Sequence, residues 1–286
     1  MQALSERLHA LLAGATLERA DLLGFSSLKT YAPTPDSLVG HRLSSVGRRA
    51  KYLVFTFDDD NRIVVHLSQA GRLDIEDPPK KTKPRGSVAR FTFTTAATGD
   101  GDARASGTVA LLVREHGTQR KASWWVLAPG DDGPLADLGP EPGTEEFAEF
   151  IRTSDSNRHL TTDLRDQHTV SGIGRGWGDD ILQRAKLSPF ASLRSLTSTQ
   201  REDLLRAATD VLAEALELER RRPGGLSEAK LGGRFSVHGR FGQPCPTPCD
   251  DTLRRVSFES YEMTYCPTCQ TGGKVLADRR LSRLLK

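Results

Sequence analysis

The spacing of apolar residues changes along the chain and predicts a β-rich part followed by a helical part. Leucines recur at helical spacing over residues 3–13 and stop at Gly14, which predicts a short amphipathic helix. Over residues 16–126 the apolar positions form short β-rich runs, the clearest at 51–57, 62–67, 88–93 and 108–113. Turn residues at 58–61 separate the first two runs, as in a hairpin. We therefore predict an antiparallel β-sandwich or barrel with one flanking helix.

Residues 130–143 are rich in Gly, Pro and Asp and show little periodicity, so we predict an interdomain linker there. Helical patterns follow, near residues 144–152, 158–166, 177–185 and 199–218. At 286 residues the chain is long enough for two domains. The fold class that we expect is α+β, with a β-sandwich domain over residues 1–129, a helical domain over 144–224 and a cysteine-bearing module over 225–286.

The only four cysteines of the chain lie close together near its end. Three residues separate Cys245 from Cys249, two separate Cys266 from Cys269, and sixteen lie between the pairs. Two short cysteine pairs joined by a spacer long enough for a β-hairpin are typical of one structural Zn²⁺ with four thiolate ligands. Two disulfides are the alternative, but polar residues interrupt any apolar core of a secretory signal at the N-terminus. We therefore favour zinc and a cytoplasmic location.

The positive charge is concentrated at the C-terminal end. Residues 221–286 hold 12 Lys and Arg against 6 Asp and Glu, whereas the whole chain has a net charge of +3. A basic module on a near-neutral body suits a phosphate-binding partner, although an ordinary solvated surface has the same composition. No apolar run approaches the roughly 20 residues of a membrane helix, so we expect a soluble protein without membrane contact.

Seven short segments stand out along nearly the whole chain: LAGAT (12–16), VGRRAKYL (46–53), HLSQAG (66–71), LGPEP (138–142), DQHTVSGIG (166–174), VHGRFGQPC (237–245) and YCPTCQ (265–270). In this order they resemble motifs of the formamidopyrimidine-DNA glycosylase and endonuclease VIII family of bacterial repair enzymes. Each segment alone is a weak signal, and the shared order makes chance similarity improbable. The resemblance implies a helix-two-turns-helix bundle and a zinc-finger β-hairpin after the β-domain.

The resemblance also implies a function. Members of this family bind double-stranded DNA that contains damaged bases or abasic sites, flip the damaged nucleotide into a pocket, cut its glycosidic bond and nick the backbone by lyase chemistry. It therefore implies base-excision repair of oxidised bases by a monomer associated with the bacterial nucleoid. The same cleft in a catalytically silent protein would bind damaged DNA without cutting it. A zinc module for protein contacts is the third hypothesis, and it leaves the upstream motifs unexplained.

The resemblance implies roles for three residues of the β-domain. Lys51 aligns with a hairpin lysine that serves in acid-base chemistry and phosphate contact. Gln69 falls where the family fills the void left by the flipped nucleotide, commonly with methionine. Arg120 is expected to assist that void-filling loop. Taken without the motifs, each of these residues reads as an ordinary surface side chain.

Four more residues are expected to contact DNA. The turn at Gly174 and the helix after it offer backbone N–H groups to a phosphate, and Arg175 replaces the asparagine usual there. On the zinc hairpin, Tyr261 stands where the family has a phosphate-binding arginine that assists the second elimination step. We expect Arg254 and Arg255 to compensate partly, and lyase activity to stop mainly after β-elimination. The short segment 220–231 has little room for a base-capping lid.

The N-terminal residues depart most from the family pattern. Family members begin with a proline, whose amine attacks the sugar C1′, followed by a catalytic glutamate. The printed sequence begins Met1-Gln2-Ala3, inside the first predicted helix. Either the recorded start lies a few codons downstream of the true one, or the protein binds DNA without cutting it or uses another amine such as Lys51. The genomic sequence upstream of Met1 decides between these explanations.

Overall fold

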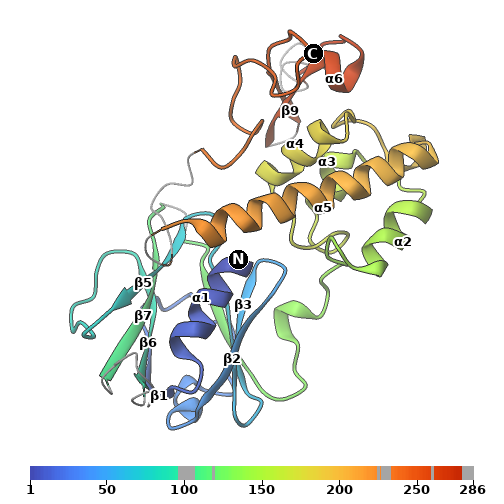
Figure 1. Ribbon diagram of the computed structural model, residues 1–286. Coiled ribbons are helices and arrows are strands. Elements are labelled where there is room, and N and C mark those ends of the chain that lie inside the picture. The colour runs from blue at the N-terminus through green and yellow to red at the C-terminus, as the bar shows by residue number, and fades with distance from the viewer. Residues whose placement is uncertain (96–106, 118–119, 224–225, 227–232, 259–260, 279–286) are drawn as a thin grey trace, which may run out of the picture. The chain divides into compact units, whose positions relative to one another are not determined.

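The computed structural model describes residues 1–95, 107–117, 120–223, 226, 233–258 and 261–278 (Figure 1). By its contacts the chain forms two compact units. Unit 1 comprises residues 1–136 and 220–230, and unit 2 comprises residues 137–219 and 231–286. Most of segment 220–231, which by its length has little room for a long base-capping lid, lies outside the described residues. Of the helices in the described part of the chain, none has the length and apolar character that crossing a membrane requires.

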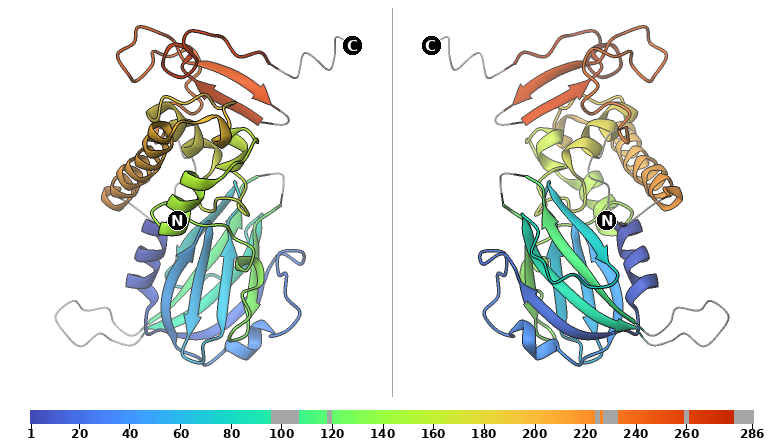
Figure 2. Two further views of the ribbon diagram at one scale, coloured as in Figure 1. Left: turned by 90° about the vertical axis from the view of Figure 1, so that its right-hand side faces the viewer. Right: turned by 90° about the vertical axis from the view of Figure 1, so that its left-hand side faces the viewer.

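Unit 1 contains two antiparallel four-stranded sheets, which lie face to face in Figure 2. The first has the strand order β1-β6-β7-β5, from β1 (Thr16–Leu22), β6 (Ser87–Thr95), β7 (Gly107–Glu115) and β5 (Gly71–Glu76). The second has the order β2-β3-β4-β8, from β2 (Leu43–Arg49), β3 (Tyr52–Phe57), β4 (Arg62–His66) and β8 (Ser123–Leu127). Helix α1 (Gln2–Leu12) packs against β2, and short 3₁₀ turns η1 (Pro35–Leu38) and η2 (Gly133–Leu135) lie in the connections. The predicted β-sandwich with a flanking helix is confirmed.

Aromatic side chains join the two sheets of unit 1. On β3, alternate residues are buried, so Phe55 and Phe57 face the interior. Phe91 of β6 meets Trp124 of β8 edge to face, with ring centroids 5.2 Å apart, and lies 6.4 Å from Phe55. Each of these rings is at most 1% exposed, so their burial supplies much of the hydrophobic stabilisation between the sheets.

A buried ion pair joins β5 to β6 and holds the connection between them in place. The Arg90 guanidinium donates from Nε to Oε2 of Glu76 at 2.8 Å and from Nη2 to Oε1 at 3.2 Å, and both side chains are at most 4% exposed. Glu76 also accepts from the Lys80 amide, and Arg90 donates to the Thr82 carbonyl. The pair therefore satisfies backbone groups of the connection between the two strands.

Unit 2 contains the α-helices of the helical part, the last of them up to Glu219, and the cysteine-bearing module from residue 231. The helices are α2 (Glu145–Thr153), α3 (Leu160–Asp163), α4 (Arg175–Arg184) and α5 (Ser198–Arg221), with a 3₁₀ turn η3 (Leu193–Ser195) before α5. Their apolar faces share one core that includes Ile173, Ile181 and Leu204. The module comprises the hairpin β9 (Arg254–Phe258) and β10 (Tyr261–Tyr265), followed by α6 (Pro267–Thr271). Together the two units make the predicted α+β fold.

Replacement of Arg90 by Met should destabilise unit 1 by about 3–5 kcal/mol, because it leaves the Glu76 carboxylate buried without its ionic partner. The double replacement Glu76→Leu/Arg90→Met should recover much of this loss. Urea unfolding followed by tryptophan fluorescence measures both effects. The matched control is Arg19→Met, which breaks a surface pair in which Arg19 is 60% exposed and should be nearly neutral. Equal effects of Arg90→Met and Arg19→Met would contradict the role of the buried pair.

Candidate functional site

Lys51 lies in the turn of the β2–β3 hairpin. Arg49 and Tyr52 form the last pair of the ladder, so Ala50 and Lys51 make a two-residue turn, with Ala50 at φ 51°. His66 pairs with Tyr52 on the neighbouring strand, and their rings lie 4.8 Å apart. Burial and the nearby charge of Lys51 lower the pKa of His66, so the imidazole stays neutral near pH 7. The turn therefore places a cation beside a neutral, partly buried base.

Gln69 lies at the exposed tip of the tight turn between β4 and β5. The Gly71 amide donates to the Leu67 carbonyl at 2.9 Å, and a Cβ at Gly71 would approach that oxygen to 2.1 Å. Only glycine fits there, and Ser68 adopts φ 56° to complete the turn. The backbone therefore presents the Gln69 side chain outward.

Arg120 is exposed in the connection from β7 to β8. The buried Glu115 carboxylate accepts from the Lys121 and Ala122 amides at 3.0 and 3.2 Å, which fixes the end of this connection. The His116 amide donates to the Ala70 carbonyl, which joins the connection to the Gln69 turn.

The strand order brings Lys51, Gln69 and Arg120 to one end of the sandwich. At this end β4 passes into β5 and β7 passes into β8, and His66 pairs with both Tyr52 and Ser123. His66 belongs to a motif of the sequence, but the sequence alone assigned it no role. Its proximity to Lys51 follows from strand register and not from sequence spacing.

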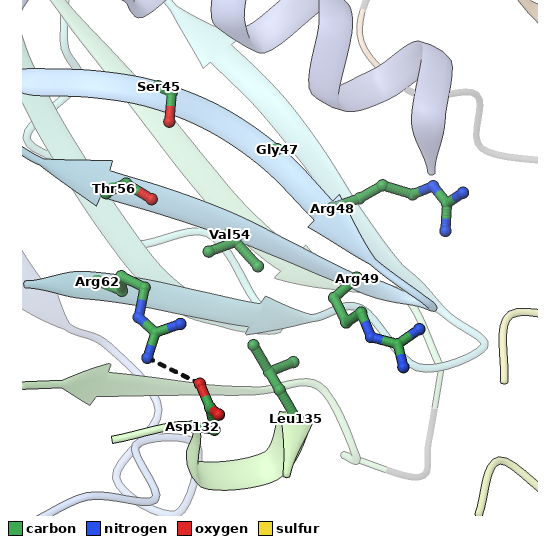
Figure 3. Close-up of a pocket in the computed structure, with 9 residues that line it drawn as sticks. All are labelled: Ser45, Gly47, Arg48, Arg49, Val54, Thr56, Arg62, Asp132 and Leu135. Carbon is green, nitrogen blue, oxygen red and sulfur yellow. Dashed lines mark hydrogen bonds and ion pairs between the residues drawn. The ribbon is translucent and has the colours of Figure 1, made fainter. Parts of the chain in front are cut away.

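A hollow of about 390 Å³ opens on the outer face of β2, β3 and β4 (Figure 3). It is lined by Ser45, Gly47, Arg48, Arg49, Val54, Thr56, Arg62, Asp132 and Leu135. Arg62 points at Asp132, at 3.2 Å, and also donates to the Asp131 carbonyl at 2.6 Å. The charge of Arg62 therefore has a partner already. The sequence predicted no site residue in this hollow.

In unit 2, Gly174 caps the N-terminus of α4 and Arg175 is its first residue. Arg175 is exposed, and the Gly178 amide is the first that bonds back to Gly174. The N–H groups in the first turn of α4 point outward from its N-terminus along the helix axis, where the helix dipole favours an anion. At Gly176 a Cβ would meet the Phe235 ring at 2.4 Å, so this glycine lets the ring pack on the helix between Trp177 and His238.

Arg254 and Arg255 of the β9–β10 hairpin make their contacts with groups other than the N-terminus of α4. Arg255 stacks on the Phe241 ring, at 4.8 Å, and pairs with Glu262 at 3.5 Å. Arg254 pairs with Tyr265 at the end of the ladder next to the cysteines. Tyr261, at the other end of the ladder, contacts Arg165 and Arg175. Arg165 was not predicted as a site residue, because nothing in its spacing links it to Tyr261.

The four cysteine Sγ atoms converge, all lying within 4.8 Å of one another. Cys245 and Cys269 are 3.9 Å apart and Cys249 and Cys266 are 3.6 Å apart, close to the roughly 3.8 Å edge of a tetrahedron with metal–sulfur bonds of about 2.3 Å. The residues present therefore fit one tetrahedral metal ion. The extra residue between Cys245 and Cys249 does not prevent this convergence.

Neighbouring groups hold the thiols in place. The Cys269 amide points at Cys266 Sγ, and Gln183 of α4 donates to Cys245 Sγ at 3.5 Å and to Thr247 at 2.8 Å. Burial raises the pKa of the Cys266 and Cys269 thiols, the latter to about 11. A bound cation would supply the charge that makes these groups thiolates.

Two adjacent carboxylates of α4 anchor the cysteine-bearing module. Asp180 accepts from the amides of Ser236, Val237 and His238 and from the Ser236 hydroxyl, at 2.7–3.0 Å. Asp179 accepts from the Thr264 amide at 3.0 Å and bonds to His238 Nδ1 at 2.7 Å. The bond to Asp179 raises the pKa of His238, whereas burial raises the pKa of Asp179.

These features define an α+β protein of the helix-two-turns-helix class with a four-cysteine hairpin. Residues 1–109 match the formamidopyrimidine-DNA glycosylase N-terminal domain, and residues 138–223 match the formamidopyrimidine-DNA glycosylase H2TH domain. The chain is 34% identical to a formamidopyrimidine-DNA glycosylase of Thermus thermophilus, over 82% of this chain and 84% of that protein. The chain therefore belongs to the formamidopyrimidine-DNA glycosylase family.

Other similar proteins extend the comparison. An uncharacterized formamidopyrimidine-DNA glycosylase-like protein of Mycobacterium tuberculosis is 43% identical over 52% of this chain and 94% of its own length. The crystal structure of the MutM (Fpg) protein from Thermus thermophilus superposes with a TM-score of 0.75 at 28% identity, over 96% of this chain and 97% of that one. The fold is also that of Lactococcus lactis Fpg in complex with abasic-site DNA, with a TM-score of 0.76 at 21% identity over 94% and 97% of the chains.

Raising the pH from about 6 to about 8.5 should loosen the module from α4. The folded pKa of His238 is raised, so its stabilisation is complete below the unfolded pKa and is lost as the pH rises through the folded pKa. Amide hydrogen exchange of residues 233–245, corrected for intrinsic rates, measures this change. His238→Gln should flatten the pH profile, whereas His168→Gln, a change at an exposed histidine of the same unit, should not. Identical profiles for the wild type and His238→Gln would refute the prediction.

Proposed function

We propose that this protein is a base-excision repair DNA glycosylase that removes oxidised bases from double-stranded DNA and cleaves abasic sites by β-elimination. The observation that carries the proposal is the match of the chain to both domains of one glycosylase family, with the motif residues in the same order. The Lactococcus lactis relative with this fold binds abasic-site DNA. The DNA partner of this chain is inferred from that likeness.

In the proposed reaction, unit 1 acts on the damaged nucleotide. An amine attacks C1′ of the sugar as the glycosidic bond breaks and the base leaves with a proton. The sugar ring then opens as the C1′–O4′ bond breaks and O4′ takes a proton, which leaves a Schiff base at C1′. This Schiff base loses a proton from C2′ as the C3′–O3′ bond breaks, and the 3′ phosphate departs with O3′. Lys51, which is half-buried in its turn, supports proton transfer and phosphate contact. Gln69 fills the space of the flipped nucleotide, and Arg120 supports it from the neighbouring connection.

Unit 2 holds the DNA backbone in this proposal. The first-turn amides of α4 after Gly174 and the Arg175 guanidinium bind a phosphate, since both a helix N-terminus and an arginine favour anions. Arg254 and Arg255 add charge on the exposed part of the hairpin. Of these two residues, Arg254 is the better candidate for a direct phosphate ligand, because Arg255 already contacts Phe241 and Glu262.

We further propose that Cys245, Cys249, Cys266 and Cys269 hold one structural Zn²⁺. Four thiolates with no position left for water are the ligand set of a closed structural site and not of a catalytic one. The ion then keeps the hairpin and α6 together, while Gln183 links the site to α4.

Catalysis is tested with duplexes that carry one oxidised purine, one oxidised pyrimidine or one abasic site. Two forms of the protein are compared, the printed sequence and one with the family's N-terminal Met-Pro-Glu-Leu-Pro-Glu-Val segment placed before it. Borohydride should trap a covalent adduct with the extended form, and Lys51→Ala should slow base excision in single-turnover assays by about a hundredfold or more. Lys81→Ala, at an exposed lysine of unit 1, is the control and should leave the rate unchanged.

The products distinguish the possible outcomes of this test. We expect cleavage that stops mainly after β-elimination, and a one-nucleotide gap with phosphate at both ends would contradict that expectation. Tight, salt-sensitive binding by both forms without an adduct would identify a binder of damaged DNA. Absence of binding by both forms would overturn the proposed function.

The purified protein should contain one zinc ion per chain, as measured by inductively coupled plasma mass spectrometry. Cys266→Ser should lose the ion and lower the melting temperature, because binding to the folded ligand set contributes folding free energy. The control is His41→Ala, in the His41, Asp58 and Asp59 group, which is the other set of close ligand-type side chains in the described residues. A Cys266→Ser variant with full zinc content would contradict the assignment.

A further inference from the structure

The first cysteine pair of the metal site is built differently from the second. In the second pair two residues separate the cysteines, and the Cys269 amide donates to Cys266 Sγ at 3.5 Å. In the first pair three residues separate Cys245 from Cys249. Within the described part of the chain, the N–H group that reaches Cys245 Sγ belongs to a side chain of α4. The longer pair therefore takes this hydrogen bond from outside its own loop.

The side chain that supplies the bond is Gln183. Its Nε2 donates to Cys245 Sγ at 3.5 Å and to the Thr247 hydroxyl oxygen at 2.8 Å. An amide NH₂ group carries two protons, so one nitrogen can make both bonds at the same time. Gln183 is only 4% exposed, so water competes little for these protons. The amide therefore bridges a metal ligand and the loop that follows it.

Thr247 is a favourable attachment point for that loop. It is the middle one of the three residues between the cysteines, and Pro246 and Pro248 stand on either side of it. A proline fixes its own φ and restricts the residue before it, so these five residues have few conformations available. A hydrogen bond to the central hydroxyl therefore fixes the loop as a whole, and with it the directions of the two flanking thiols.

The second cysteine pair is attached to the same end of α4 by a different glutamine. Gln270 of α6 accepts from the Cys266 amide and donates to the Leu187 carbonyl just beyond α4, each at 2.8 Å. Gln183 is the last residue but one of α4. Both pairs thus meet the C-terminal end of one helix through a buried amide. Gln270 bonds backbone groups there, whereas Gln183 bonds the sulfur itself.

A bond to sulfur responds to the metal. A sulfur atom that ligates Zn²⁺ is a thiolate, and an N–H group donates more strongly to a charged acceptor than to a neutral thiol. The bond from Gln183 to Cys245 is therefore stronger when the ion is bound than when it is absent. That difference contributes to metal affinity, as other groups that hydrogen-bond to metal ligands do.

We propose that Gln183 is a positioning residue of the metal site, which holds Cys245 and its three-residue loop in place and thereby raises the affinity for Zn²⁺. The proposal rests on the proposed zinc site and adds to it a residue from outside the cysteine-bearing module. The adaptation suits this chain in particular, because its first cysteine pair has one residue more than its second.

The test starts from the zinc-loaded full chain and measures the dissociation constant by equilibrium transfer of Zn²⁺ to a chromophoric chelator. Gln183→Met, which keeps the side-chain length and removes the donor, should weaken affinity about tenfold or more. Thr247→Val, which removes the hydroxyl, should weaken it about three- to tenfold, whereas Thr247→Ser should stay close to wild type. Gln243→Met, the same change at an exposed glutamine of the module, is the matched control.

A spectroscopic readout separates the hydrogen bond from simple packing. In the Co²⁺-substituted protein, Gln183→Met should move the sulfur-to-cobalt charge-transfer band to longer wavelength, because the thiolate loses a donor that stabilises its electrons. The band of Gln243→Met should stay where it is in the wild type. A weaker affinity with an unchanged band would show a packing effect alone and would overturn the proposal.

The double variant Gln183→Met/Thr247→Val shows whether the two residues act as one unit. If they do, its affinity is no more than about twofold weaker than that of Gln183→Met, because both changes remove the same contact. Additive losses, or a Gln183→Met variant with wild-type affinity, would overturn the proposal while the wild type still holds zinc. A wild type without zinc would instead overturn the zinc site, and this proposal with it. The melting temperature of each zinc-loaded variant shows that it is folded.

Discussion

Two adjacent carboxylates on α4 hold the cysteine-bearing module in place. Asp180 collects three backbone amides and one hydroxyl from residues 236–238, and Asp179 bonds to His238 and to the Thr264 amide of β10. Both side chains are at most 4% exposed, so their desolvation is offset in large part by these hydrogen bonds. The position of β10, and with it that of Tyr261 and of the cysteines on either side of the hairpin, therefore depends on this pair.

Unit 1 carries polar loop residues at the end of two tightly packed sheets. Rings from both sheets interlock in its core, and Glu76 with Arg90 ties the β5–β6 connection to that frame. The turns that carry Lys51 and Gln69 are short, so their backbone has little conformational freedom. Side chains carried on such turns are oriented before any ligand binds, which lowers the ordering cost of binding.

Much of the fold is predictable because its signals are local. The hydrophobic period predicts helix α5 (Ser198–Arg221) over residues 199–218, and short apolar runs predict the β-sandwich. Helix α3 is predicted over 158–166 but spans only Leu160–Asp163, because Leu164 and the residues after it turn to form the approach to α4. The linker boundaries and the DNA-binding roles stay predictions. Arg165 and His66 could not be found in this way, since their partners are distant in the sequence.

The sequence by itself determined the family, the α+β class and the grouping of four cysteines, because motif order, hydrophobic period and ligand spacing are properties of short segments. Only the tertiary structure decided that Asp179 and Asp180 anchor the hairpin and that Tyr261 meets Arg165. It also decided that Lys51, Gln69 and Arg120 share one end of the sandwich. Such contacts depend on burial between distant elements and on strand register, since a shift of one residue along a strand would turn its side chains to the opposite face.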